Sequence, residues 1–437
     1  MPLMAVSDRT ATTRFWHPFA DMSAVSQQEF LVERGEGVWV YDADDRRFLD
    51  ATAALWYANV GHGRAEIADR VAAQMKRLEA YSTFGDFGNR PANELAERLA
   101  ATAPMPDSRI FMTSGGGDSI DAAAKIARRH WVLQGQPERV HLISRTNGYH
   151  GTHGFGTSIG GIEANTSNWG PLIPHTSAVQ HDSLEALEAE ILRIGPERVA
   201  AFFCEPVIGA GGVYPPAEGY IEGVADLCAE HGVLFVCDSV ICAFGRLGTW
   251  WGIERWDVQP AMITFAKGVT SGYLPLGGVV VSGEIAAPFI DGSAPMLRHG
   301  ATYAGHPSCC VAGLAVLDIY ENENLIERGR ELEGPLRDAL APLADHPAVA
   351  EVRAGTGFLA AVAVSDDALA ADPAAVAKVA QGAREAGVLV RPLLKGVAVS
   401  PPLICEQEHI DLIAEGIRAG LDRIDSAPAK PDVSSGG

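Results

Sequence analysis

Two charged residues stand directly after apolar runs that indicate buried strands. Lys267 follows the run at 261–266, and Asp238 follows the run at 233–237. Open α/β sheets bind ligands at the carboxyl ends of their strands, so these two side chains are expected to face one ligand. A lysine in such a place can form a Schiff base when its neighbours lower its pKa.

A lysine and an aspartate together indicate one kind of cofactor. The aspartate can keep a pyridinium nitrogen charged, and the lysine amine can react with an aldehyde. Pyridoxal 5′-phosphate (PLP) chemistry requires both groups. A lysine at the end of a strand is often simply solvated, so Lys267 and Asp238 need support from other parts of the sequence.

A glycine-rich turn suited to a phosphate lies earlier in the chain, between a strand expected at 110–113 and a helix expected at 120–133. It consists of Ser114, Gly115, Gly116 and Gly117. Glycines let the backbone wrap an anion, and a helix N-terminus offers free N–H groups and a favourable dipole. A tight turn without a ligand would have the same composition. Neither GxGxxG nor the lysine of GxxxxGK[ST] is present, which disfavours nucleotide binding.

An aromatic residue and a carboxylate follow two further β-rich runs. Tyr149 comes after the run at 140–144 and could stack on a flat ring, or pack on the core as an ordinary loop residue. Glu205 directly follows the next apolar run and could be a functional group or a solvated loop acid. No Glu or Cys completes a metal-binding pattern with His150 and His153, so no metal site is expected.

An arginine late in the chain, Arg391, stands between apolar residues. Its guanidinium could clamp a substrate carboxylate with two parallel hydrogen bonds, or form a surface ion pair. The segment 300–307 precedes a long helical pattern at 310–321. None of these features decides the function by itself.

Composition excludes some classes of function. The chain has 437 residues, of which 47% are hydrophobic and 20% charged, as in ordinary globular proteins. Its formal net charge of −21 argues against binding nucleic acid or an anionic membrane by overall electrostatics. Seven cysteines without a CxxC spacing indicate buried free thiols in a reducing compartment. With no signal peptide and no bilayer-spanning apolar run visible, a cytoplasmic location is expected.

Helix-like and strand-like segments alternate between about residues 90 and 285. This alternation predicts an α/β fold with a mostly parallel sheet flanked by helices. Helices are expected at 92–101, 120–133, 183–193, 220–230 and 310–321. Strands are expected at 110–113, 140–144, 199–204, 233–238, 261–266 and 279–281, with further strands near 349–352, 358–364 and 388–391.

The chain is too long for one core and predicts one large and one smaller domain. An N-terminal segment, 1–58, contains a small hairpin and is expected to join the smaller domain. Residues 59–307 are expected to form the large cofactor-binding domain, and 308–427 a smaller α+β domain. The tail at 428–437 is expected to be disordered.

Taken together, these motifs closely resemble the class III (ω-amino acid, amine:pyruvate) PLP-dependent aminotransferases. The similarity runs from about residue 14 to 425, and its most specific parts are the segments 238–248, 264–278 and 302–307. Membership of this family implies the PLP-dependent transferase fold type I. It also implies an enzyme that binds PLP and small-molecule amine and keto-acid substrates, and neither nucleic acid nor a membrane.

The resemblance implies a role for each matching residue. Lys267 would be the Schiff-base amine and proton shuttle, and Asp238 would pair with the pyridine nitrogen; these two are the expected catalytic residues. Tyr149 and Val240 would contact opposite faces of the ring. The residues expected around the cofactor are Ser114, Gly115, Gly116, Gly117, Tyr149, His150, Glu205, Asp238, Val240, Ile241, Lys267 and Thr302.

The substrate side and the assembly follow from the same resemblance. The expected substrate-binding residues are Trp56, Phe84, Tyr149 and Arg391. Arg391 resembles a mobile arginine that binds a substrate carboxylate, and Glu205 is expected to pair with it when the site is empty. Thr302 would reach the phosphate in the neighbouring subunit, which implies a homodimer, or a dimer of dimers, with shared active sites.

Three departures from the family pattern bear on the chemistry. Ser239 stands where an acid is common, and Ile241 stands where a glutamine often bonds the ring hydroxyl. An apolar residue at the second position is seen in the amine and ω-amino acid:pyruvate branch. The phosphate turn reads Gly-Gly-Gly-Asp at 115–118 where the family often has Gly-Ser-Glu, so a hydroxyl ligand is missing and Ser114 or the backbone must compensate.

The expected function is therefore transfer of an amino group from an amine or ω-amino acid to a keto acid, with pyruvate as the favoured acceptor. The opening FWHPF motif at 15–19 resembles the diaminopelargonate transaminase branch, so that activity and a 4-aminobutyrate type transaminase remain alternatives. A PLP aminomutase of the same fold and a non-catalytic relative are the other hypotheses. A binding protein would have no need for Lys267.

Overall fold

The computed structural model describes residues 13–27 and 29–424. The tail at 428–437 therefore lies outside the described residues. The helices of the described part are α1 (Met22–Val25), α2 (Ala53–Trp56), α3 (Ala65–Arg77), α4 (Arg90–Thr102), α5 (Gly116–Leu133), α6 (Gly154–Ser158), α7 (Glu163–Thr166), α8 (Leu184–Ile194), α9 (Tyr220–Glu230), α10 (Gly283–Ile290), α11 (Pro307–Asn322), α12 (Leu325–Glu331), α13 (Glu333–Leu340), α14 (Asp366–Ala371), α15 (Ala375–Glu385) and α16 (Gln407–Leu421). None of them is long and apolar enough to cross a membrane.

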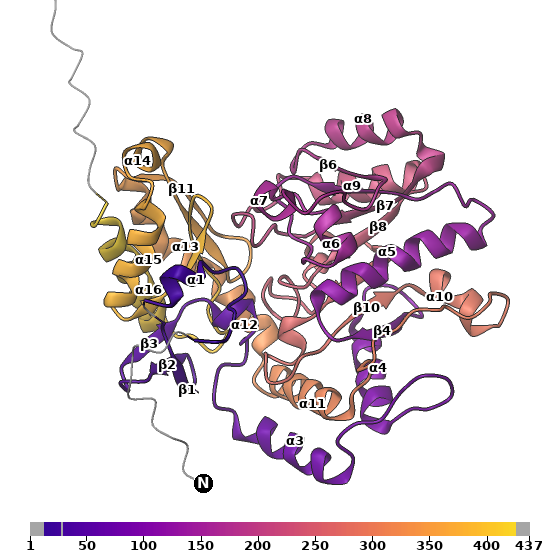
Figure 1. Ribbon diagram of the computed structural model, residues 1–437, viewed down its shortest axis with the longest axis horizontal. Helices are drawn as coiled ribbons and strands as arrows, with labels where there is room; N and C mark the ends of the chain where they lie inside the picture. Colours follow the sequence, from indigo (N-terminus) through magenta and orange to yellow (C-terminus); the bar gives the residue numbers. More distant parts are fainter. Residues whose placement is uncertain (1–12, 28, 425–437) are drawn as a thin grey trace, which may run out of the picture.

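A seven-stranded sheet, called the central sheet below, lies among the helices on the right-hand side of Figure 1. Its strands, in spatial order, are β4 (Arg109–Thr113), β10 (Gly277–Val281), β9 (Met262–Phe265), β8 (Leu234–Asp238), β7 (Val199–Cys204), β5 (His141–Arg145) and β6 (Thr176–Val179). Strand β10 pairs antiparallel with both of its neighbours, and all other pairs are parallel. The carboxyl ends of β4, β5, β7, β8 and β9 therefore meet at one edge, and the predicted α/β fold is confirmed.

Helices cover both faces of this sheet, which explains why its strands are apolar throughout. Every residue of β7 is buried, and the side chains alternate between two cores. Phe202 packs in a cluster with residues of α4, α8, α9 and α11. Phe203 packs on the opposite face in a cluster built mainly from α5. A parallel sheet that is covered on both sides needs continuous rather than alternating hydrophobicity.

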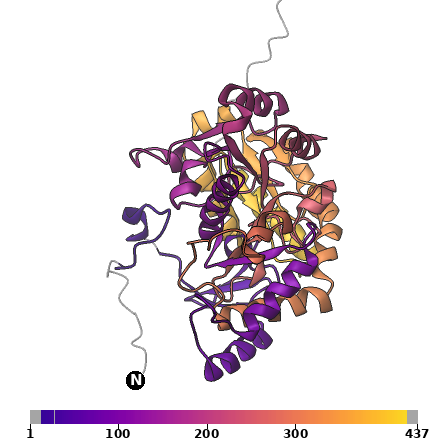
Figure 2. The same ribbon diagram turned by 90° about the vertical axis from the view of Figure 1, so that its right-hand side faces the viewer.

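Two four-stranded sheets lie beside the central one. In the first, β1 (Val32–Glu36), β2 (Trp39–Asp42) and β3 (Arg47–Asp50) are joined by β13 (Val388–Leu389), which pairs parallel with β3. The second has the order β11 (Val349–Arg353), β12 (Ala360–Val364), β15 (Gly396–Val399) and β14 (Arg391–Leu393). The N-terminal strands thus lie against the C-terminal part of the chain, as both views show (Figures 1 and 2).

A buried arginine joins three distant parts of the chain. Arg246 is fully buried, and its guanidinium donates to Phe358 O and Pro401 O, each at 2.7 Å, and to Asn59 Oδ1 at 2.8 Å. Burial lowers the pKa of Arg246 to about 10. These bonds tie the segment after β8 to both the N-terminal and the C-terminal parts that flank the central sheet.

We expect Arg246→Ala to lower the free energy of unfolding by roughly 3 kcal/mol, because it leaves three buried oxygens without a donor and opens a cavity. Urea denaturation followed by circular dichroism measures the change. Arg193→Ala is the matched control, since Arg193 is exposed on α8 and pairs only with Glu190 within that helix. Equal stability of the two variants would contradict a joining role for Arg246.

Candidate active site

Lys267 follows β9 after a single residue and has a strained backbone. Its φ is +50°, in the left-handed region that side chains other than glycine rarely adopt. The next residue, Gly268, allows the turn to close, because a Cβ there would lie 2.8 Å from Asn59 Nδ2 and 2.9 Å from Phe244 Cβ. Strain that packing holds in place is typical of functional positions.

The environment of Lys267 favours its neutral amine. Loss of hydration lowers the pKa of Lys267, and Arg391 lowers it further, while the carboxylates of Asp238 and Glu205 oppose the shift. The net direction is downward. A neutral amine is the nucleophilic form of lysine, so the surroundings prepare this side chain for attack on a carbonyl.

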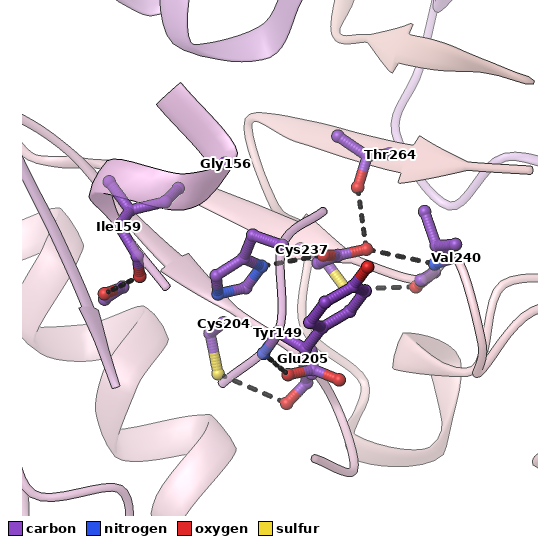
Figure 3. A network of polar contacts seen from close by, with 12 residues as sticks. Tyr149, Gly156, Ile159, Cys204, Glu205, Cys237, Val240 and Thr264 are labelled. Atoms are coloured by element: carbon purple, nitrogen blue, oxygen red, sulfur yellow. Dashed lines mark hydrogen bonds and ion pairs between the residues drawn. The ribbon is translucent and has the colours of Figure 1, made fainter. Parts of the chain in front are cut away.

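Asp238, at the end of β8, is held by three segments (Figure 3). Its Oδ1 accepts hydrogen bonds from Thr264 Oγ1 at 3.0 Å and from the Val240 N–H at 3.1 Å. Its Oδ2 lies 2.7 Å from His150 Nδ1. A carboxylate has about four lone-pair sites, so Asp238 can still accept a hydrogen bond from a ligand.

Glu205 is buried and holds two loops at the edge of the sheet. Its Oε1 accepts from the Tyr149 N–H and its Oε2 from the Gly209 N–H, both at 3.0 Å. Burial raises the pKa of Glu205, and nearby Asp238 raises it further. Among the described residues no ion pair joins Glu205 to Arg391. The expected pairing is not present in this structure, and the carboxylate bonds the N–H groups of Tyr149 and Gly209 instead.

The phosphate turn is built differently from the expectation. Helix α5 begins at Gly116, four residues earlier than predicted, so Gly116 and Gly117 form its first turn and their N–H groups have no partner within the helix. A Cβ on Gly116 would lie 3.1 Å from Val240 Cγ1. Glycine thus brings the helix start against Val240, two residues from Asp238.

These groups lie in sequence along one edge of the sheet. Asp238 stands at one end, Val240 beside it and the first turn of α5 beyond, with Lys267 close to Asp238. Comparison with known proteins tests what this site is for. The profile of the family described as aminotransferase class-III matches residues 22–421.

The chain belongs to the class III aminotransferases.

Individual relatives of this class III aminotransferase agree. The putrescine–pyruvate aminotransferase of Pseudomonas aeruginosa is 34% identical and covers 95% of the chain and 98% of that protein. The omega-aminotransferase of Caulobacter vibrioides is 35% identical, covering 97% of the chain and 100% of that protein. An amine transaminase from an uncultivated Pseudomonas species, solved in a PLP-bound form, has a TM-score of 0.90 at 34% identity, covering 95% and 100%.

The class is PLP-dependent, and the residues of this aminotransferase fit the cofactor. Gly116 leaves a cradle that a Cβ would fill, beside N–H groups that suit a phosphate. Asp238 is a buried carboxylate with acceptor capacity to spare, which suits a pyridinium nitrogen. Lys267 is a desolvated amine that suits an aldehyde.

The structure places other predicted residues of the aminotransferase around this cluster. Ile241 packs over the turn that Glu205 holds, since a Cβ on Gly209 would lie 2.4 Å from Ile241 Cδ1. Trp56 is buried in the same apolar cluster as Ile241. Ser114 and Gly115 link β4 to α5, and the Ser114 N–H donates to Asp118 Oδ2 at 3.3 Å.

Two predicted residues lie apart from the cluster. Thr302 and Phe84 are both exposed, and they line a separate hollow of about 330 Å³ together with Ala80, Tyr81, Ser82, Tyr303 and His306. A larger hollow, of about 640 Å³, is lined by Phe19, His153, Trp169 and neighbouring residues and also excludes Lys267. Within one chain, Thr302 and Phe84 therefore do not join Lys267.

Two residues of the site escaped the sequence analysis. Thr264 bonds Asp238 from the adjacent strand β9, and Gly209 bonds Glu205. Thr264 could have been found, because a hydroxyl inside an otherwise apolar strand needs a buried partner. Gly209 carries no such signal, since it contributes only a backbone N–H to Glu205 and room for the side chain of Ile241.

Proposed function

We propose that this aminotransferase moves the amino group of an amine or ω-amino acid to a keto acid, with pyruvate as the favoured acceptor. The observation that carries the proposal is the Lys267–Asp238 pair, a desolvated amine beside a fixed carboxylate at the strand ends. Relatives named putrescine–pyruvate and beta-alanine–pyruvate aminotransferase support the choice of substrates.

Bound PLP supplies an aldehyde and an electron-withdrawing ring. The chain's own residues do the rest. Lys267 offers a neutral amine that can take up and return a proton at the substrate carbon. Asp238, held by Thr264 and His150, keeps a positive charge at the ring nitrogen favourable. Tyr149, whose N–H is fixed by Glu205, supplies an aromatic face for stacking.

The substrate side combines an apolar wall with one available cation. Trp56 and Ile241 belong to a buried apolar cluster, which suits the carbon chain of an amine. Arg391 is exposed at the start of β14, yet its charge is close enough to help lower the pKa of Lys267 and to oppose the rise that burial causes in the pKa of Tyr149. Among the described residues it has no fixed acid partner. It is therefore free to bind the carboxylate of a keto acid.

A donor–acceptor panel tests the function. With an amine donor alone, the PLP-loaded enzyme should release one equivalent of aldehyde or ketone and stop, and added pyruvate should restart turnover. Putrescine, β-alanine and 4-aminobutyrate as donors, with pyruvate and 2-oxoglutarate as acceptors, separate the pyruvate branch from the alternatives. Repeated turnover of a donor, beyond one equivalent per site and without any keto acid, would indicate an aminomutase and contradict the proposal.

We expect Arg391→Ala to raise KM for pyruvate by about ten- to a hundredfold, because it removes a charge-assisted, bidentate hydrogen-bond donor. KM for an amine without a carboxylate should change less than about twofold. Lys395→Ala is the matched control, since Lys395 is an exposed cation on the same hairpin that pairs with Asp366. Equal effects on both substrates would remove Arg391 from the substrate site.

We propose that the enzyme works as a homodimer in which Thr302 and Phe84 complete the partner's site. Large exposed aromatic side chains support an interface: Tyr81, Phe84, Phe87 and Tyr303 are each more than half exposed. The segment around α1 also stands out from the body in Figure 2 and exposes Phe15, Trp16 and Phe19. Light scattering measures the molar mass of the enzyme in solution and so distinguishes a dimer from a dimer of dimers.

We also propose a cytoplasmic location for the enzyme. All seven cysteines are free and buried, as expected for a protein that works in a reducing compartment.

A further inference from the structure

A histidine lies flat against the first turn of α5. A Cβ on Gly117 would be 3.2 Å from Cγ and Cδ2 of His153 and 3.3 Å from its Cε1. Three ring atoms at nearly equal distance mean that the imidazole presents its face to Gly117. The chain two residues before His153 is also close to this turn, since a Cβ on Gly151 would lie 2.9 Å from the Cα of Gly117.

The loop at 149–153 thus runs along the whole proposed ligand site, from Asp238 to the start of α5. At the pyridine end, Tyr149 is fixed by Glu205 and His150 bonds Asp238. Two residues beyond Gly151, His153 stands at the helix start, which is the phosphate end. The two histidines of this loop therefore sit at opposite ends of the ligand site, and only His150 has a role in the proposed function so far.

The helix start needs a cation if it is to hold a phosphate. Asp118 lies in the first turn of α5, and its carboxylate would repel a phosphate that carries nearly two negative charges. His153 Nδ1 lies 3.2 Å from Asp118 Oδ1, and the Ser114 N–H donates to Asp118 Oδ2. The carboxylate of Asp118 therefore already interacts with His153 and with the Ser114 N–H. Ser119, the nearby hydroxyl, is buried and donates to Gly115 O and Phe265 O.

We propose that His153 is a ligand of the PLP phosphate, with its Nδ1–H toward Asp118 and its Nε2–H donated to a phosphate oxygen. An imidazole that donates from both nitrogens is the cationic form. The side chain is about half exposed, so it can turn toward the ligand without leaving Asp118. The inference rests on the proposed PLP site at Lys267 and Asp238.

The same contact explains the departure at Gly117. A serine there would place its Cβ 3.2 Å from the ring, which forces His153 to shift by a few tenths of an ångström. Glycine and imidazole are therefore complementary: the ring occupies the space that a hydroxyl-bearing side chain would use. The two positions should behave as a coupled pair rather than as independent sites.

The test measures cofactor affinity rather than turnover. Apoenzyme is titrated with PLP and, separately, with pyridoxal, which lacks the phosphate, and visible absorbance reports occupancy. His153→Ala should weaken PLP binding by at least about tenfold, the loss of one charge-assisted hydrogen bond, and leave pyridoxal binding within about twofold. His175→Ala is the matched control, because His175 is an exposed histidine at the other end of the sheet and should change neither affinity.

The coupled pair gives a second, independent outcome. Gly117→Ser alone should weaken PLP binding, because its Cβ presses on the ring of His153. In the His153→Ala background the same change should strengthen PLP binding, because the ring is gone and a hydroxyl is gained. Thermal unfolding of each variant checks that the fold is intact.

Three results would overturn the proposal. One is an unchanged PLP affinity in His153→Ala, and another is an equal loss for PLP and pyridoxal, which indicates a structural role. The third is an additive effect of the two substitutions. Failure of the proposed PLP site is distinguishable, since the spectrum of PLP mixed with wild-type apoenzyme would then stay that of free PLP, without the shift that linkage to a lysine causes.

Discussion

Lys267→Ala should abolish transamination, lowering kcat by roughly 10⁴- to 10⁶-fold, as removal of a covalent catalytic group does elsewhere. The reason is that, within residues 13–27 and 29–424, no other desolvated amine stands beside Asp238: burial lowers the pKa of Lys267, and its backbone has the strained positive φ. Steady-state assays with a donor and pyruvate measure the rate. The purified variant should also lack the visible absorbance of PLP linked to a lysine.

Two further variants separate chemistry from charge. Lys267→Arg places a permanent cation at the strand end but offers no amine that can condense with an aldehyde, so it should be as inactive as the alanine variant. Lys76→Ala, an exposed lysine on α3, should behave like wild type. Turnover near the wild-type rate in Lys267→Ala would disprove the role assigned to this lysine.

Asp238→Asn should lower kcat by about 10²- to 10³-fold while PLP still binds to Lys267. An amide carries no charge to balance a protonated ring nitrogen. Its single N–H₂ group would also replace one of the two acceptor oxygens, and so face either Thr264 and Val240, which bond Oδ1, or His150, which lies at Oδ2. Absorbance spectra and steady-state kinetics on the same preparation separate cofactor binding from catalysis.

The control for this change is Asp226→Asn, an exposed aspartate on α9 that should leave both binding and kcat unchanged. A variant Asp238→Asn with full kcat would mean that Asp238 does not pair with the ring. If Asp238→Asn lost both PLP binding and turnover, the role of Asp238 at the end of β8 would be mainly structural. The two substitutions, at Lys267 and Asp238, should therefore differ in cofactor content as well as in rate.

The central strands could be predicted well because burial on both faces leaves a local signal. The run at 199–204 is β7 in full, and the runs at 233–238 and 261–266 contain β8 and β9. Helix α5 was predicted four residues too late, since glycines at 116 and 117 have poor helix propensity and only packing against Val240 and His153 stabilises them there. Helix α3 (Ala65–Arg77) and strand β6 (Thr176–Val179) were missed.

The sequence by itself determined which groups stand at strand ends. Lys267, Asp238 and Glu205 each follow an apolar run directly, and a glycine-rich turn precedes a helix; both signals are local and need no partner to be visible. The family resemblance then supplied roles for these groups. The confirmed part of that expectation is the class III aminotransferase family, its fold and its PLP dependence.

Only the tertiary structure decided which of these groups meet. His150 and Asp238 are 88 residues apart in sequence and 2.7 Å apart in space, and Glu205 bonds two backbone N–H groups rather than Arg391. Such contacts depend on strand order and on how helices pack on the sheet, which no local pattern encodes. The flat contact of His153 on Gly117 is the clearest case. The sequence shows that Gly117 lacks a Cβ, but only the structure shows that the ring of His153 fills that space.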